Sequence, residues 1–488
     1  MVYANENKDS YLDRYSREKN IFHGVIEVDL DDSTLFTLGH TLQKSDANSP
    51  MWGALPLNFS DGSATDYSRS TSTSTDWAYW DMQENRSFAE LAHNFANGWQ
   101  AKAVLTHVEK KGDSSLFYVY GTPDRDTGLG LFSYPSEYQE KNKQLIADLY
   151  ASGPFALAGR EHELVVGGSW SKSELEDMSW YDSTTGTALP PLEDWTGTIG
   201  RPLNDLPTND SDFTDRMQSV YSAARWSLSD SLNLITGVRV VDVESSGGSY
   251  GVDKTTKYSS EIVPYVGLIY DLNEQYSVYA SYTEIFDPQT EIDMSGARLA
   301  PVEGVNYEAG IKAELLDDKV NLSLAVFRTE QDNLAEFVEM VEGKNRYRSV
   351  DGITSEGYEV EVSGELLQGL QATAGYTFVD IRDAEDQHAV TYSPKHMLRA
   401  SSTYRIPGLE QLKVGASMSW QDDIRNGIAE QDAYALVNLM ASYEIDRNWT
   451  VSANLNNLTD EKYLTSLYWT QAYYGAPRNA SMTVSWNY

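Results

Sequence analysis

The chain has 488 residues, with 37 Lys and Arg against 73 Asp and Glu, which gives a formal net charge of −36. This charge argues against nucleic acid as a partner, because phosphate neutralisation needs clustered basic residues. Hydrophobic residues make up 41% and aromatic residues 12%, which excludes a largely disordered chain. Cysteine is absent, which excludes disulfides, thiolate metal sites and a cysteine nucleophile. The 32 Tyr against 13 Phe favour surfaces with one apolar and one wet side, such as a membrane interface or a binding face.

The start of the chain and its apolar runs contain no familiar membrane or export signal. Met1 to Lys8 has no basic region, apolar region or small-residue cleavage site, so it does not resemble a signal peptide. No stretch approaches roughly 18 consecutive apolar residues, so we expect no membrane-spanning helix.

Pairs of alternating segments recur from one end of the chain to the other. In each pair, two runs of about ten residues with period-2 alternation flank a very short polar turn. The turns are expected at 31–33, 97–98, 159–160, 229–230, 273–274, 317–318, 368–369, 407–408 and 446–448. These hairpins, a final strand from Met482 to Tyr488 and a partial strand near Met1 predict about twenty strands.

The connections between these hairpins are long and irregular. The expected loops are rich in Gly, Ser, Thr, Asp and Pro and cover 46–77, 112–140, 174–214 and 426–432. Short turns at one end and long loops at the other are typical of an outer-membrane barrel. A soluble propeller or pair of sandwiches is the alternative, but it has turns of similar length at both ends and usually a repeated blade motif. The pattern therefore predicts an all-β fold, a transmembrane antiparallel β-barrel.

Several segments also carry a family resemblance, in order and with sensible spacing. They are 95–99, 159–167, 276–289, 306–312, 357–364, 456–463 and 474–479. Together they resemble the barrel of TonB-dependent ferric-siderophore receptors of the ferripyoverdine and hydroxamate, coprogen-like type. Family members more often end in Phe or Trp than in Tyr, so the terminal Tyr488 is a mild departure.

The resemblance implies a domain organisation that this chain only partly contains. Family members have a signal peptide, a TonB-box segment and a plug domain before a barrel of about 22 strands. By this comparison the chain begins inside the third strand, with 2–8 as its end and 11–16 as the following loop. Residues 1–488 are therefore expected to be an N-terminally truncated barrel domain of about twenty strands, without plug or signal peptide.

The resemblance also implies a function, a location and a set of partners. It implies an outer-membrane receptor and transporter of a Gram-negative bacterium that takes up a ferric siderophore, energised through TonB in the intact parent. The implied partners are a hydroxamate or mixed-type ferric siderophore, membrane lipid and lipopolysaccharide, and the TonB complex through the plug. A monomer is expected. Because the siderophore already coordinates the iron, no cofactor and no protein-bound metal are expected.

The candidate ligand-binding residues are aromatic side chains near the expected long loops. Such rings give a large, rigid contact area at small entropic cost. The candidates are Trp52, Trp77, Tyr79, Trp80, Trp180, Trp195, Tyr468, Trp469, Tyr473 and Tyr474. The resemblance favours Trp77 and Trp80, because family members carry a similar Trp-x-x-Trp at that strand start. For each ring the alternative is an aromatic girdle at the membrane surface.

No residue constellation predicts catalysis. The seven histidines do not pair at metal-ligand spacing, and the Glu161-His162-Glu163 segment lacks the second histidine of a zinc-protease helix. We therefore expect no enzyme. The rival functions are a passive outer-membrane pore and a surface receptor or adhesin. Large ungated conductance would favour the pore, and fluorescence quenching by a ferric hydroxamate would favour the receptor.

Overall fold

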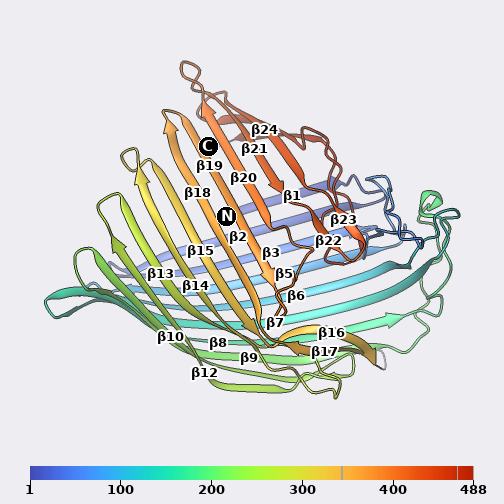
Figure 1. Cartoon of the computed structure of the whole chain (residues 1–488), viewed down its shortest axis with the longest axis horizontal. Coiled ribbons are helices and arrows are strands. Elements are labelled where there is room, and N and C mark those ends of the chain that lie inside the picture. Colours follow the sequence, from blue (N-terminus) through green and yellow to red (C-terminus); the bar gives the residue numbers. More distant parts are fainter. Residues whose placement is uncertain (342–343, 470, 487–488) are drawn as a thin grey trace.

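The computed structural model describes residues 1–341, 344–469 and 471–486, and it is dominated by one antiparallel sheet (Figure 1). Within these residues the main sheet has 21 strands, including the two-residue β11. Each expected tight turn joins neighbouring strands, and these hairpins are β2–β3, β5–β6, β7–β8, β9–β10, β12–β13, β14–β15, β18–β19, β20–β21 and β24–β25. The prediction of these hairpins is confirmed, because period-2 alternation is the pattern of a strand with two unlike faces.

The main sheet runs through the whole sequence. Its strands in the first half are β1 (Val2–Asp9), β2 (Ser16–Asp31), β3 (Thr34–Asn48), β5 (Tyr79–Asn94), β6 (Gln100–Gly121), β7 (Leu131–Leu157), β8 (Arg160–Tyr181), β9 (Asn209–Ser227), β10 (Leu232–Ser249) and β11 (Val252–Asp253). Those in the second half are β12 (Thr256–Asp271), β13 (Tyr276–Asp287), β14 (Val302–Leu315), β15 (Val320–Asp332), β18 (Ile353–Leu367), β19 (Leu370–Arg382), β20 (His396–Arg405), β21 (Leu412–Gln421), β24 (Tyr434–Glu444), β25 (Trp449–Asn456) and β27 (Asn479–Trp486).

Smaller elements lie in the long connections. They are the hairpins β16 (Leu334–Val341) with β17 (Lys344–Val350) and β22 (Ile424–Asn426) with β23 (Ala429–Gln431), the pair β4 (Leu55–Pro56) with β26 (Gln471–Ala472), and the 3-10 turn η1 (Leu192–Asp194). No helix in the described ranges has the length and apolar character needed to cross a membrane.

The two faces of the sheet differ in chemistry. Cross-strand partners share a face, and one row across β6 to β9 contains Ala103, Leu149, Gly168 and Val220. Leu149 and Val220 in this row are 61% and 62% exposed, which marks a surface built to contact something apolar. We call this side the apolar face. The opposite side carries the polar partners of the ladder and is called the polar face.

The two ends of the sheet are β1 and β27. Strand β1 pairs with β2, and β27 pairs with β25. Across the described ranges no pairing joins β1 to β27, so the sheet shown is curved but not closed (Figure 1). The strand expected near Met1 is present as β1, and the expected final strand is β27, whereas its last residue, Tyr488, lies outside the described residues.

Three expected loops are shorter than the sequence suggested. Strand β6 continues to Gly121 and β7 begins at Leu131, so most of 112–140 is paired. Similarly, β8 and β9 leave only 182–208 between them, and much of 426–432 belongs to the β22–β23 hairpin. A high content of Ser, Thr, Asp and Gly marks solvent exposure, but a two-stranded ribbon can continue through such residues. The composition therefore placed the ends of β6 and β8 too early and the starts of β7 and β9 too late.

The long connections pack together at one end of the sheet. We call the connections 49–78, 182–208 and 457–478 the loop crown, within the residues described. Its hydrophobic core contains Leu55, Tyr67, Phe117, Val119, Leu131, Leu189, Leu192 and Tyr474. These residues come from all three connections and from the tips of β6 and β7, so the crown holds the long-loop end in a defined shape.

Candidate functional site

The extended β6–β7 ribbon presents a row of tyrosines to the connection that follows β3. Tyr118 on β6 pairs with Tyr134 on β7, and Trp52 forms an isolated bridge with Tyr118. The Trp52 ring centroid lies 5.7 Å from Tyr118, 6.4 Å from Tyr134 and 5.3 Å from Tyr138. Edge and tilted contacts at these separations are the favoured geometries of aromatic pairs. The cluster is therefore a preformed aromatic surface.

A cavity of about 550 Å³ opens within this cluster. It is lined by Trp52, Gly53, Tyr118, Tyr120, Tyr134 and Thr185. Gly53 has φ +77°, and a Cβ placed there would lie 2.3 Å from the Tyr118 ring, so only glycine fits without moving the wall. A concave, mainly aromatic cavity with a few hydroxyl groups suits a ligand that offers flat or aliphatic surface and some polar atoms.

Two of the predicted aromatic residues hold the crown beside this cavity. Trp77 packs edge-on to Phe117 at 6.0 Å, and Trp195 stacks on the same ring at 5.6 Å. The indole N–H of Trp77 donates to the carbonyl of Ile199, and that of Trp195 donates to the carbonyl of Ser74. These bonds join the first connection of the crown to the second. In this arrangement both indoles serve the packing of the crown.

A buried carboxylate fixes the second connection. Asp182 accepts hydrogen bonds from the Thr184 N–H at 2.8 Å and its hydroxyl at 2.5 Å, and from the N–H groups of Leu203 and Asn204. Burial disfavours the charged carboxylate, but these donors outweigh it and hold the pKa of Asp182 below its ordinary value. The ionised side chain thus links the start of the connection between β8 and β9, at Thr184, to its end, at Leu203 and Asn204.

The third connection is tied to the first by charges. Arg69 donates from Nη1 to the Asp460 carboxylate at 2.8 Å, and the Arg478 N–H donates to the same oxygen. The Arg478 N–H and then Arg69 lower the pKa of Asp460. Lys462 lies 4.3 Å from the centroid of the buried Tyr474 ring, a cation–π contact. Tyr474 is therefore a core residue of the crown in this structure.

The other predicted site residues lie around the crown. The hydroxyl of Tyr79 donates to Asp113 at 2.5 Å, and Arg201 lies over its ring. Trp80 is 41% exposed and lies on the polar face of β5, whereas Trp180 lies at the end of β8 on the side of Glu137. Tyr468, Trp469 and Tyr473 are exposed, and the first two contact each other at 4.9 Å. Trp52 is the predicted residue that lines the cavity.

Several residues of the cavity were not found from the sequence. Tyr118, Tyr120 and Tyr134 were missed because 112–140 was treated as a loop, and Gly53 lies in the loop expected at 46–77, where only aromatic residues were considered. The available signal was the alternation Phe117-Tyr118-Val119-Tyr120, which places two tyrosines on one face of a strand.

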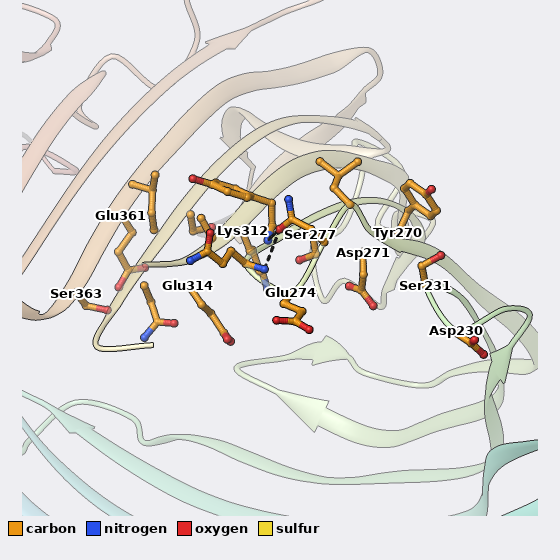
Figure 2. A pocket seen from close by; sticks show the side chains of 18 residues that line it. Asp230, Ser231, Tyr270, Asp271, Glu274, Ser277, Lys312, Glu314, Glu361 and Ser363 are labelled. Carbon is orange, nitrogen blue, oxygen red and sulfur yellow. Dashed lines mark hydrogen bonds between the residues drawn. The ribbon is translucent and has the colours of Figure 1, made fainter. Parts of the chain in front are cut away.

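A second cavity of about 980 Å³ lies at the tight-turn end of the sheet (Figure 2). Its carboxylates are those of Asp230, Asp271, Glu274, Glu314 and Glu361, and Lys312 is the lysine that lines it. Asp271, Ser277, Lys312, Ser323 and Glu361 form one cross-strand row of the polar face. This end of the polar face therefore carries excess negative charge.

The acidic residues and histidines of the described ranges form no metal-ligating cluster. In the part of the chain that the structure describes, no three His, Cys, Asp or Glu side chains are grouped so that they could hold a metal ion. His162 lies near the β7–β8 turn. Its Nδ1 accepts a hydrogen bond from the N–H of Ser227 on β9 at 3.0 Å, and its Nε2 lies 3.1 Å from the carbonyl oxygen of Leu157 on β7. The aromatic cavity offers rings and hydroxyl groups to whatever enters it.

The sheet, its tight turns at one end and the loop crown at the other define a class of protein. The model of the family described as TonB dependent receptor-like, beta-barrel matches residues 27–458, and the chain belongs to this family.

Individual relatives carry more specific names. The chain is 37% identical over 517 residues to the ferripyoverdine receptor of Pseudomonas aeruginosa, covering 100% of the chain and 62% of the relative. It is 36% identical over 501 residues to the ferric-pyoverdine BN7/BN8 receptor of Pseudomonas putida, covering 99% and 61%. The chain thus spans about three-fifths of the length of these relatives.

A solved structure agrees with the sequence comparisons. The crystal structure of the ferripyoverdine receptor of the outer membrane of Pseudomonas aeruginosa bound to ferripyoverdine superposes with a TM-score of 0.92 at 36% identity. The superposition covers 99% of this chain and 67% of that one. The fold of this chain is therefore that of the barrel part of such receptors.

Proposed function

We propose that this chain is the barrel domain of an outer-membrane receptor that takes up a ferric siderophore, energised through TonB in the intact protein. The family membership and the names of the similar receptors support this function. The preformed aromatic cavity beside Trp52 is the structural observation that carries it. Binding followed by release is the physical work, and no covalent step is needed.

The ligand is a ferric complex of hydroxamate or mixed type. Such a complex presents the outside of a bulky chelator, so the protein contacts aliphatic, aromatic and amide groups instead of iron. The tyrosine hydroxyls and the Thr185 side chain give the cavity hydrogen-bonding partners among its rings. The exposed Tyr468, Trp469 and Tyr473 extend the aromatic surface beyond the cavity.

The apolar face contacts the hydrocarbon of a Gram-negative outer membrane, with lipopolysaccharide as neighbour, and the receptor works as a monomer. Exposed Leu and Val on this face suit lipid, and Trp449 and Trp486 at the tight-turn end suit the interface. TonB acts through the plug of the intact protein.

Binding to Trp52 tests the proposal. We expect ferrioxamine B or ferripyoverdine to quench the fluorescence of the detergent-solubilised chain at sub-micromolar concentration. Replacing Trp52 by Ala removes the central ring of the cavity and is expected to weaken binding about tenfold or more. Trp180→Ala, at the end of β8 and outside the cavity, is the matched control. Equal affinity of the two variants for the siderophore would reject the proposed site. Absence of quenching by every member of a panel of ferric siderophores would reject the proposed ligand class.

A passive pore is the second candidate, and the acid-lined cavity of Figure 2 is the observation that favours it. Carboxylates without matching cations would make such a pore select cations. Large, ungated and cation-selective conductance in planar bilayers, with no response to siderophore, would favour the pore over the receptor.

A further inference from the structure

On the polar face, small residues of β6 lie between larger residues of β5 and β7, directly beside the aromatic cluster around Trp52. Two neighbouring cross-strand rows make up this strip, and they contain Trp80, Ser114 and Tyr138 in the first row and Met82, Gly112 and Glu140 in the second. We call the strip over Ser114 and Gly112, with its larger neighbours as walls, the trough. At ordinary strand spacing the two walls are about 10 Å apart, which leaves room for one arm of a bulky ligand.

The trough continues the aromatic surface that begins at Trp52. The ring of Tyr138 lies 5.3 Å from that of Trp52, and Trp80 on the opposite wall is 41% exposed. A Cβ at Gly112 would lie 3.0 Å from Sδ of Met82 and 3.6 Å from Cβ of Glu140, so a side chain at this position would fill the floor. An open floor beside an exposed indole is the kind of surface that holds a ligand.

Two carboxylates stand directly opposite each other at the end of the trough nearer to the tight turns. Glu140 on β7 is the cross-strand partner of Asp177 on β8, and both lie on the polar face. Like charges in directly opposite positions destabilise a sheet. The hydroxyl of Tyr250 donates to Asp177 at 2.5 Å, which orients this carboxylate but adds no positive charge. The pair is therefore favourable only when a cation lies beside it.

The described residues do not supply this cation. Within the described ranges, no Lys, Arg or His side chain lies within ion-pair distance of Glu140 or Asp177. Lys110, one row further along β6, lies 3.6 Å from the carboxylate of Glu84. Lys19 is in the same row as Glu140 but four strands away, which is about 19 Å at ordinary strand spacing. The positive charge is thus left to a ligand.

We propose that the trough binds a positively charged arm of the ferric siderophore, an ammonium or guanidinium group, between the two rings of its walls and against Glu140 and Asp177. Aromatic faces and carboxylates both attract such a group. The inference rests on the proposed function and deepens it, because it selects chelates with a cationic arm within the hydroxamate or mixed class.

Two forms of one chelate test the charge. Ferrioxamine B carries a protonated terminal amine, and its N-acetyl derivative lacks this charge but keeps the same iron(III) trishydroxamate centre. We expect ferrioxamine B to quench the tryptophan fluorescence of the whole chain in detergent with an affinity about tenfold or more above that of the N-acetyl form. The combined Glu140→Gln and Asp177→Asn variant should bind both forms equally. Its affinity for the N-acetyl form should match that of the parent, which also shows that the variant is folded.

The matched control removes two carboxylates from the other face of the sheet. Glu176 on β8 and Asp212 on β9 also stand directly opposite each other, but Lys141 is the next residue in their row. The combined Glu176→Gln and Asp212→Asn variant makes the same change in net charge and should keep the parent's preference for ferrioxamine B. An equal loss of preference in this control would assign the effect to the overall negative charge of the chain and overturn the site.

The other outcomes separate this inference from the proposed function. Equal affinity of the parent for the two forms, or a preference that survives in the Glu140→Gln and Asp177→Asn variant, overturns the cationic subsite and leaves the receptor function in place. Quenching by other ferric siderophores but not by ferrioxamine B overturns the subsite as well. Absence of quenching by every ferric siderophore rejects the proposed function and this inference together.

Discussion

At the scale of single residues, the long-loop end depends on a few side chains that satisfy many partners. Asp182 collects backbone donors from both ends of its connection, and Arg69 binds Asp460 across two connections. Asp182 is buried, and a buried polar group is costly to leave unpaired, while the partly exposed Arg69–Asp460 pair adds a link between two connections. Both fix loop shapes that composition alone would leave open. These residues hold in place the connections that surround the cavity beside Trp52.

Asp182→Asn is expected to loosen the connection between β8 and β9. The amide offers one acceptor oxygen in place of a carboxylate, so donors at Leu203 or Asn204 lose their partner, at a cost of about 1–3 kcal/mol in local opening. Hydrogen exchange at these two amides should accelerate roughly tenfold or more. Asp205→Asn, an exposed carboxylate on the same connection, should change exchange there much less.

The same carboxylate gives a pH dependence. Because folding lowers the pKa of Asp182, its stabilisation is present above the unfolded-state pKa of about 4 and is lost as pH falls through the lower folded-state pKa. Protection of the Leu203 and Asn204 amides, which donate to Asp182, should therefore decline in acid in the parent, whereas Asp182→Asn should show much less acid dependence at these two amides. A parallel decline in both proteins would contradict the role assigned to this carboxylate.

At the scale of elements, the tight-turn end was predictable and the long-loop end was not. Alternation followed by a short polar turn such as Asn-Gly or Asp-Asp is a local signal, so each predicted tight turn joins two paired strands in the structure. The ends of β6 and β7 were misplaced, because Ser- and Asp-rich segments look alike whether paired or not. Trp77 and Trp195 were predicted as ligand-binding residues near long loops, and their shared packing on Phe117 depends on contacts between distant segments that the sequence does not show.

His162 joins three strands at the tight-turn end and offers a test at this scale. It is 5% exposed, packs against Phe155 and Trp226, and accepts the Ser227 N–H. His162→Ala leaves that donor unpaired and a cavity between the rings, so the free energy of unfolding should fall by roughly 2–4 kcal/mol.

Urea unfolding in detergent micelles, followed by tryptophan fluorescence, measures this loss. His40→Ala is the control, because His40 is exposed and its ring is hydrogen-bonded to Ser87 on a neighbouring strand, so its loss should change stability by less than about 0.5 kcal/mol. Equal effects of the two substitutions would show that the buried histidine is not a structural link.

At the scale of the whole molecule, the proposed function requires one face of the sheet to contact lipid and the other to contact water. The apolar face exposes Leu105, Leu149 and Val220, while the polar face in the adjacent row carries Asp148, Ser169 and Ser219. In hydrocarbon every backbone group of a spanning strand needs a partner, which the ladder supplies between β2 and β25. Under the proposed function, the loop crown stands outside the membrane and the aromatic cavity faces the ligand.

Site-directed spin labelling along β7 tests the central claim most directly, and the absence of native cysteine makes single labels clean. In liposomes, labels at positions 145, 147 and 149 should be reached by oxygen and protected from a water-soluble nickel chelate. Labels at 144, 146 and 148 should show the reverse, giving a period of two. Uniform access of the nickel chelate at all six positions would contradict a lipid-facing sheet and the receptor function built on it.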